Sequence, residues 1–291
     1  MSTPSGAPAF DLQSHSTCSD GSLEPAAVVA AAEAAGVQLL ALTDHDTVEG
    51  VAEALRAADE HGIRLVPAVE LSTADVLGED FHVLGYNIDH TDETFCAHMR
   101  LWCEDRALRI ERMAARLVEL GLPPDRTVLD DRRARGCPIG RPHLAAAAIV
   151  GNRERLAREG LDEPSAFLEA YLVAGAPAYS RRTTPTVSEA IDAIHAAGGL
   201  AVWAHPFWDL AAHEEVSIAL ARFAAAGLDG VEAFYATHDS AQTALLCALA
   251  DELGLLTTGS ADFHGHDHVR FSRFRAFDLH GHAPRLGPID R

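Results

Sequence analysis

The first ninety residues alternate between nearly continuous apolar runs and segments that are apolar at helical spacing. The runs at 37–43 and 64–70 are typical of parallel strands buried on both faces. The segments at 24–35 and 48–61 are each followed by glycine, which commonly ends a helix. Shorter strands are predicted at 10–13 and 81–86. This alternation with short links predicts right-handed βαβ units.

The pattern becomes helical in the middle of the chain. A long helix is predicted over 93–120, another begins at Arg141, and a third covers 162–173, with no strand pattern between them. The β/α alternation then resumes, with helices at 186–197, 214–225 and 240–253 and strands at 200–204, 230–234 and 256–259. We expect a discontinuous barrel domain, a helical insertion and two tails, covering 9–90 with 185–270, 91–184, and 1–8 with 271–291, respectively.

Acidic and histidine side chains stand where these strands should end. In α/β barrels the functional groups project from the carboxyl ends of the strands, so we expect these side chains to share one rim. His82 is the weakest member, because it lies inside a strand, where a buried core histidine is the common case. The candidates are His15, Asp20, Asp44, His45, Glu70, His82, His205, Asp262 and His264.

The residue types indicate a metal centre. Carboxylates and imidazoles without thiolates favour Mn²⁺, Fe²⁺ or Zn²⁺. Clustered divalent ions polarise a phosphoryl group and generate hydroxide near neutral pH. The sequence therefore favours a metal site suited to phosphoester hydrolysis.

Composition and charge indicate the class of protein, its cellular compartment and its partners. The chain has 291 residues, 48% of them hydrophobic, and no apolar run of the about 18 residues that a membrane span needs. The first eight residues lack the pattern of a signal peptide and are expected to form a disordered tail. Five cysteines without a CxxC pair favour a reducing cytoplasm. A formal net charge of −20 argues against binding long nucleic acid. The oligomeric state stays open.

At the candidate residues the chain resembles the PHP family, named for its polymerase and histidinol phosphatase members. The resembling stretches are 10–21, 41–47, 67–72, 81–85, 203–206 and 259–264. Within the family it is most similar to bacterial stand-alone phosphoesterases with a helical insertion. Those act on nucleoside monophosphates, on 3′,5′-bisphosphorylated nucleosides, or on short RNA from the 5′ end. The resemblance implies a distorted seven-stranded (βα) barrel that holds up to three metal ions.

The same resemblance implies which residues bind each ion. The implied sets are His15, Glu70 and Asp262; Glu70, His82 and His205; and Asp20, His45 and His264. Asp44 would orient its neighbour His45.

Gln13 departs from the pattern, because the family normally has histidine at this position. A glutamine carbonyl binds transition metals more weakly than imidazole does. Three interpretations stay open: the first ion is held by fewer or weaker ligands, the Gln13 oxygen coordinates, or the site works with two ions.

An acidic rim needs cations to bind an anionic substrate. The best candidates are Arg141 and His143 at a predicted helix start, where backbone N–H groups and a guanidinium can share a phosphate. Related phosphoesterases have a similar Arg-x-His. Arg181 and His238 are further candidates for substrate binding. For most arginines of the long helix, Arg106, Arg109 and Arg112, we expect a solvated face with ion pairs one turn apart.

We therefore expect a metal-dependent phosphatase, with manganese favoured, that acts on AMP or a 3′,5′-bisphosphonucleoside. His205 or a metal ion would assist departure of the alkoxide. One alternative is a 5′–3′ exoribonuclease on short RNA. Another is a non-catalytic metal-binding module whose site decayed at Gln13.

Overall fold

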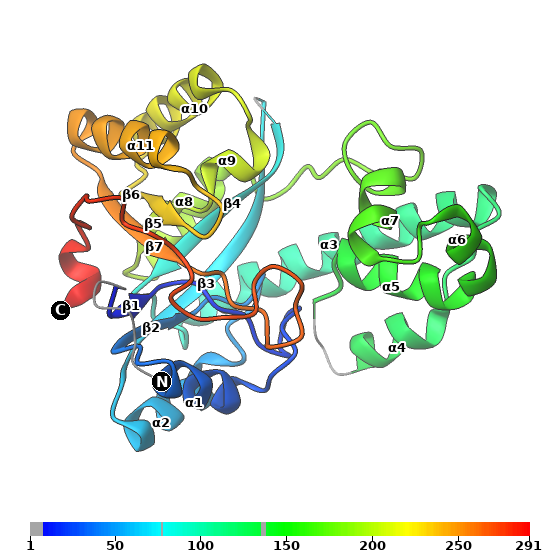
Figure 1. The fold of residues 1–291 in the computed structure, drawn as a ribbon, viewed down its shortest axis with the longest axis horizontal. Helices are drawn as coiled ribbons and strands as arrows, with labels where there is room; N and C mark the ends of the chain where they lie inside the picture. Colours follow the sequence, from blue (N-terminus) through cyan, green and yellow to red (C-terminus); the bar gives the residue numbers. More distant parts are fainter. Residues whose placement is uncertain (1–7, 77, 135–137) are drawn as a thin grey trace. The chain divides into compact units, whose positions relative to one another are not determined.

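A computed structural model describes residues 8–76, 78–134 and 138–291. Almost all of the predicted N-terminal tail, residues 1–7, and Cys137 lie outside these ranges. The chain divides into two compact units, shown in Figure 1. Unit 1 comprises residues 1–99 and 185–291, and unit 2 comprises residues 100–184. Within the described residues, no helix combines the length and apolar character that crossing a membrane requires.

Unit 1 is built on a seven-stranded sheet whose strands follow one another in chain order. The strands are β1 (Phe10–Asp11), β2 (Leu39–Leu42), β3 (Arg64–Asp75), β4 (Gly78–Tyr86), β5 (Leu200–Trp203), β6 (Gly230–Tyr235) and β7 (Leu256–Ser260). The first and last strands meet, because Leu12 N donates to Gly259 O over 3.2 Å and Ser14 forms a parallel bridge with Phe263. The sheet is thus a nearly closed barrel, which confirms the predicted α/β fold.

Strand β4 departs from the parallel arrangement and runs antiparallel to both β3 and β5. The expectation of parallel βαβ units was wrong here. Strand β3 ends at Asp75 and β4 begins at Gly78, whereas a parallel return needs a crossover of about a dozen residues. The hairpin also lengthens both strands beyond their predicted ranges, and Figure 1 shows them as a long pair of arrows.

The helices of unit 1 begin and end close to the predicted positions. They are α1 (Pro25–Ala34), α2 (Val51–His61), α8 (Val187–Ala196), α9 (Pro206–Asp209), α10 (His213–Ala225) and α11 (Ser240–Leu253). Gly62 ends α2 with a left-handed φ of 67°, which explains why glycine stands there. Apolar side chains of α1 and α2 pack against β2, as in the buried cluster of Val28, Leu40 and Ala54. The short helix α9 was not predicted.

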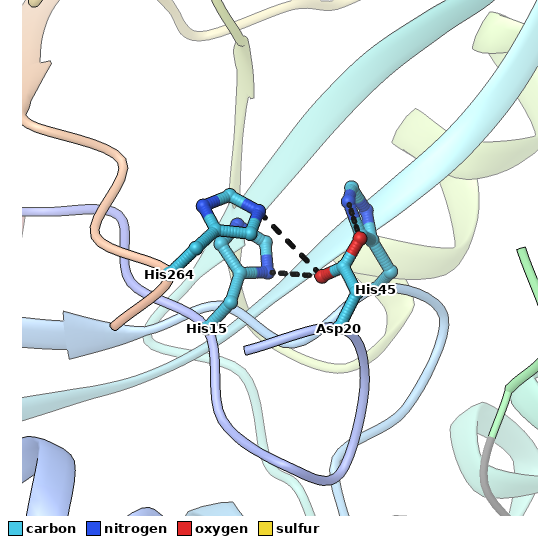
Figure 2. A group of neighbouring side chains, drawn as sticks. All are labelled: His15, Asp20, His45 and His264. Atoms are coloured by element: carbon cyan, nitrogen blue, oxygen red, sulfur yellow. Dashed lines mark ion pairs between the residues drawn. The ribbon is translucent and has the colours of Figure 1, made fainter. Parts of the chain in front are cut away.

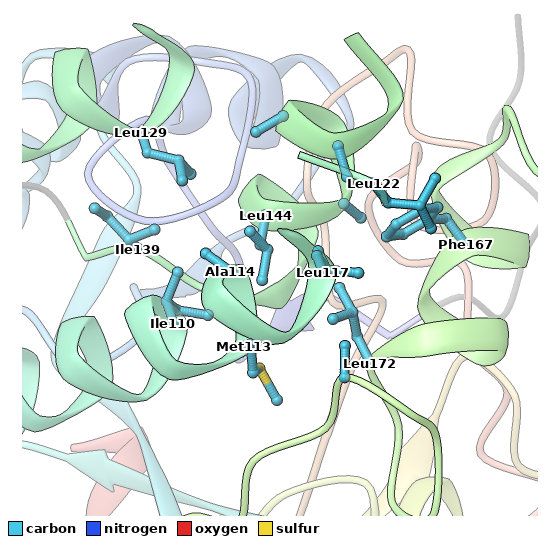
Figure 3. Close-up of a cluster of buried hydrophobic side chains, with 14 of the residues drawn as sticks. Ile110, Met113, Ala114, Leu117, Leu122, Leu129, Ile139, Leu144, Phe167 and Leu172 are labelled. Carbon is cyan, nitrogen blue, oxygen red and sulfur yellow. The ribbon is translucent and has the colours of Figure 1, made fainter. Parts of the chain in front are cut away.

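Unit 2 contains helices and connecting segments, with no strand among its described residues. The long helix α3 (Glu93–Glu119) begins in unit 1, and α4 (Arg126–Ala134), α5 (Arg141–Gly151), α6 (Arg153–Glu159) and α7 (Pro164–Tyr171) follow. Figure 3 shows its own apolar core, in which Leu117, Leu144 and Phe167 are fully buried. A unit with such a core needs no strand to exclude water from its centre.

Two arginines of α3 are not solvated as expected. Arg106 and Arg109 are buried, whereas Arg112 is exposed. Arg109 donates from Nε to Ser180 O over 2.7 Å, and its guanidinium lies 5.3 Å from the Tyr179 ring centre. A planar guanidinium can be buried when carbonyl oxygens and aromatic faces replace its water. These contacts connect α3 with the segment at 179–180 within unit 2.

Candidate metal centre

Glu70 on β3 lies at the centre of a ring of imidazoles. Its Oε1 is 2.6 Å from His82 Nδ1 and 3.1 Å from His205 Nε2. Its Oε2 is 3.1 Å from His15 Nε2 and 3.4 Å from His45 Nδ1. Burial by itself raises the pKa of Glu70, but the surrounding imidazoles outweigh burial and hold it well below its ordinary value. The structure therefore keeps a charged carboxylate in the interior.

Asp20 lies between three further imidazole nitrogens, as Figure 2 shows. His15 Nδ1, His45 Nε2 and His264 Nε2 each lie 3.6 Å from one of its oxygens. The rings of His15 and His264 are stacked, with centres 4.2 Å apart. At 3.6 Å these three contacts are ion pairs, longer than ordinary hydrogen bonds. Such an arrangement suits a shared cation.

Asp262 connects this group with Glu70. Its Oδ1 lies 3.1 Å from His15 Nε2, and its Oδ2 accepts a 2.7 Å hydrogen bond from the Tyr235 hydroxyl. Burial raises the pKa of Asp262, but His264 and His15 outweigh it and lower the pKa to about 2. Asp262 has a φ of 55°, a left-handed conformation that costs an ordinary residue energy and often marks a functional position.

The donor set fits divalent cations. The potential ligands form three groups, and within each group the ligand atoms all lie within 4.8 Å of one another. The groups are His15, Asp20, His45 and His264; His45, Glu70 and His82; and His15, Glu70 and Asp262. Buried His15 Nε2, His45 Nδ1 and Asp262 Oδ1 make ion-pair contacts but no hydrogen bond of good geometry within the described residues, which leaves their lone pairs available to a cation. Imidazole nitrogens and carboxylate oxygens are the ligands of Zn²⁺, Fe²⁺ and Mn²⁺.

The grouping differs in detail from the implied ligand sets. The set of His15, Glu70 and Asp262 recurs unchanged. His45 joins Glu70 and His82, while His205 contacts the same Glu70 oxygen, Oε1, as His82 does. His82, which the sequence made the weakest candidate, makes the shortest contact with Glu70.

Gln13 uses its amide nitrogen in the cluster. Its Nε2 donates a 2.9 Å hydrogen bond to Glu70 Oε2. Its Oε1 lies 3.4 Å from Ser260 Oγ. An amide nitrogen has no free lone pair with which to bind a metal ion. In this arrangement the amide nitrogen of Gln13 binds the Glu70 carboxylate and is not itself a metal ligand.

Asp44 organises the loop that carries Asp20. It accepts hydrogen bonds from Ser16 N over 2.7 Å, Ser16 Oγ over 2.6 Å and Ser19 Oγ over 2.5 Å. Ser19 Oγ in turn lies 3.4 Å from His15 Nδ1. The side chain of Asp44 thus binds the loop of Ser16 and Ser19, whereas the sequence predicted that it orients His45.

Two residues of β6 contribute to the cluster without having been predicted. Glu232 is fully buried and accepts from His205 N over 2.9 Å and from Ser260 Oγ over 2.6 Å. Burial raises its pKa to about 8. Tyr235 holds Asp262. A glutamate within the otherwise apolar run of β6 was the available signal, since a buried carboxylate in a strand needs a partner.

The predicted substrate residues fall in both units. In unit 2, Arg141 is the first residue of α5, His143 Nδ1 accepts from Gly140 N over 3.0 Å, and Arg181 is exposed. In unit 1, His238 is buried and lies 3.2 Å from Ala233 O through Nδ1. Burial lowers the pKa of His238 to about 4, so its ring is neutral at pH 7. The substrate roles of these residues stay predictions.

A nearly closed seven-stranded barrel with a carboxylate–imidazole cluster among its loops defines a metal-dependent hydrolase. Residues 11–108 match the PHP domain. Among characterised proteins, a 5′–3′ exoribonuclease of Haemophilus influenzae is 34% identical, with 88% of this chain and 89% of that protein aligned. A 3′,5′-nucleoside bisphosphate phosphatase of Chromobacterium violaceum is 31% identical, with 88% and 87% aligned.

Solved structures show the same likeness. A Chromobacterium violaceum protein described as an amidohydrolase, with bound sulfate and no metal, superposes with a TM-score of 0.77 at 30% identity, covering 97% of this chain and 93% of that one. A Bifidobacterium adolescentis protein proposed to be a metal-dependent phosphoesterase gives 0.74 at 27% identity, covering 92% and 91%. The chain belongs to the PHP domain family, as the motifs predicted. It is a metal-dependent phosphoesterase, a hydrolase of phosphoric ester bonds.

Proposed function

We propose that this phosphoesterase removes phosphate from a nucleotide or a related small phosphomonoester, using two or three divalent ions, with Mn²⁺ favoured. The observation that carries the proposal is Glu70, a buried carboxylate surrounded by four imidazoles. Bound ions would polarise the phosphoryl group and lower the pKa of water. The relative named as a nucleoside bisphosphate phosphatase supports the nucleotide assignment.

In this proposal each cluster residue has a defined task. The ligands are three carboxylates and the imidazoles that converge on them, namely Asp20, Glu70 and Asp262 with His15, His45, His82, His205 and His264. His205 Nε2 cannot bind an ion and donate a proton at once, and its 3.1 Å approach to Glu70 favours the ligand role. Asp44 fixes the loop of Asp20, and Gln13 orients Glu70 through the hydrogen bond from its amide nitrogen.

For the substrate, we keep Arg141, His143 and Arg181 as proposed phosphate contacts. Guanidinium groups bind phosphate oxygens in pairs, which makes an acidic protein with a net charge of −20 able to accept an anion locally. A Michaelis constant that rises in Arg141→Ala, with an unchanged turnover number, would support a binding role.

A second candidate function is 5′–3′ hydrolysis of short RNA, favoured by the 34% identical relative that bears this name. The two candidates are separated by substrate. Phosphate release should be measured from AMP, adenosine 3′,5′-bisphosphate and p-nitrophenyl phosphate with Mn²⁺, Mg²⁺ and Zn²⁺. A 5′-phosphorylated oligoribonucleotide should be followed in parallel for stepwise shortening.

The experiment has a clear failure. Protein that contains bound metal and turns over none of these phosphoesters would overturn the proposed function and would favour a non-catalytic metal-binding module. Glu70→Gln is the matched control, because it keeps the size of the side chain and removes the charge that the imidazoles surround. Activity that survives in this variant after its bound metal is lost would point to a contaminating phosphatase.

A further inference from the structure

Trp208 is a large aromatic side chain held at the surface beside the metal centre. It lies on the short helix α9, three residues after His205, and 49% of its surface is exposed. Single exposed apolar residues are common, but a half-exposed tryptophan fixed beside a catalytic cluster is not explained by the barrel core. Its neighbours show that it is positioned by specific contacts.

Two series of ring contacts connect Trp208 with the proposed ligands. In one, its ring centre lies 6.5 Å from that of Tyr235, and Tyr235 lies 5.3 Å from His205. In the other, Trp208 lies 5.7 Å from Phe271, and Phe271 lies 5.7 Å from His264. The indole is therefore one aromatic ring away from the metal centre along either route.

Arg270 adds a cation to this surface. Its guanidinium carbon lies 5.5 Å from the centre of the Trp208 ring, and the arginine itself is exposed. Arg270 follows the loop of His264, so both sides of the pair are anchored to segments that carry proposed ligands. All of these residues belong to unit 1.

We propose that Trp208 and Arg270 form a subsite for the nucleobase of the substrate whose phosphate occupies the metal centre. This inference rests on the proposed function, because it names the part of the substrate that the phosphoester chemistry leaves unrecognised. Every base has an aromatic face, and stacking on an aromatic side chain gives sequence-tolerant binding. The guanidinium of Arg270 attracts the same electron-rich ring and the anionic substrate.

The subsite predicts a preference for phosphates that carry a base. In the Mn²⁺-loaded protein, kcat/KM for AMP and for ribose 5-phosphate should be compared between wild type, Trp208→Ala and Trp208→Phe. We expect Trp208→Ala to lower kcat/KM for AMP about tenfold, the loss of one stacked base, and to leave ribose 5-phosphate within about twofold. Trp208→Phe should recover part of the loss, and Arg270→Ala should also affect AMP more strongly.

A binding measurement separates this inference from the proposed function. A phosphonate analogue of AMP that cannot be hydrolysed should be titrated calorimetrically into the same proteins, so that no turnover is needed. A Kd that rises about tenfold in Trp208→Ala supports the subsite even in a protein that hydrolyses none of the tested esters. Equal losses with AMP and ribose 5-phosphate, or an unchanged Kd for the analogue, would overturn it.

Discussion

Gln13 donates a hydrogen bond from its side-chain nitrogen to Oε2 of Glu70 over 2.9 Å. The same carboxylate oxygen lies 3.1 Å from His15 Nε2, so an amide donor and a proposed ligand meet at one atom. Of the interpretations left open by the sequence, we propose that the first ion is held by fewer ligands, because the amide nitrogen of Gln13 contacts Glu70. This contact also explains why glutamine is tolerated, because it satisfies a buried carboxylate.

The first prediction concerns Gln13→His. An added imidazole should strengthen ion binding at His15, Glu70 and Asp262, and we expect Kd for the weakest Mn²⁺ to fall about tenfold or more. Titration calorimetry and elemental analysis would measure this. Gln13→Met is the matched control, since it keeps the length of the side chain and supplies no amide. If Gln13→Met lost an ion and Gln13→His gained none, the glutamine oxygen would be a ligand.

The second prediction concerns the shared carboxylate. Glu70→Gln removes the charge that four imidazoles surround, and the neutral amide binds hard cations more weakly. We expect bound metal to fall and phosphoesterase activity to drop by about a hundredfold or more. Metal content and phosphate release should be measured on the same preparation. Full activity with full metal content would show that Glu70 is not at the reaction centre.

The third prediction concerns Tyr235, whose hydroxyl donates to Asp262 Oδ2 over 2.7 Å. Tyr235→Phe removes only this hydrogen bond and frees Asp262 to turn away from His15. Losses of hydrogen-bond partners behind metal ligands typically cost about 10–100-fold in metal affinity or activity. Mn²⁺ affinity should fall with little change in thermal stability. A variant with wild-type affinity would mean that the left-handed backbone alone holds Asp262.

The fourth prediction is a pH dependence of stability. Burial lowers the pKa of His238 to about 4 from an ordinary value of 6.5, so folding favours the neutral ring. Its contribution is complete above pH 6.5 and is lost as the pH falls through 6.5 toward 4, by at most about 3 kcal/mol. The difference in unfolding free energy between wild type and His238→Phe should change over this window and stay constant above it.

Urea unfolding of metal-free protein at several pH values would measure that difference. The comparison isolates His238, because the other titrating groups are common to both proteins. A difference that did not vary with pH would show that the ring is hydrated or already protonated in the folded state.

The elements outside the metal centre were largely predictable from local pattern. Helix α11 and strand β7 coincide with their predicted ranges to within a residue, because apolar spacing and glycine ends are local signals. The antiparallel β4 was missed because the strands were recognised one at a time, while direction depends on the connection between them. Arg109 was expected in water because its partners at Ser180 and Tyr179 lie far along the chain.

The sequence by itself determined the family, the barrel and the residues that gather in the cluster, since most of them lie beside a strand end that a local pattern marks. Glu70 and His82 are the exceptions, because they lie inside β3 and β4. Only the tertiary structure decided how those residues are paired. The amide of Gln13 faces Glu70, Glu232 holds the backbone of His205, and Trp208 stands beside the cluster. Such contacts depend on side-chain orientation between strands far apart in the chain, which no single segment encodes.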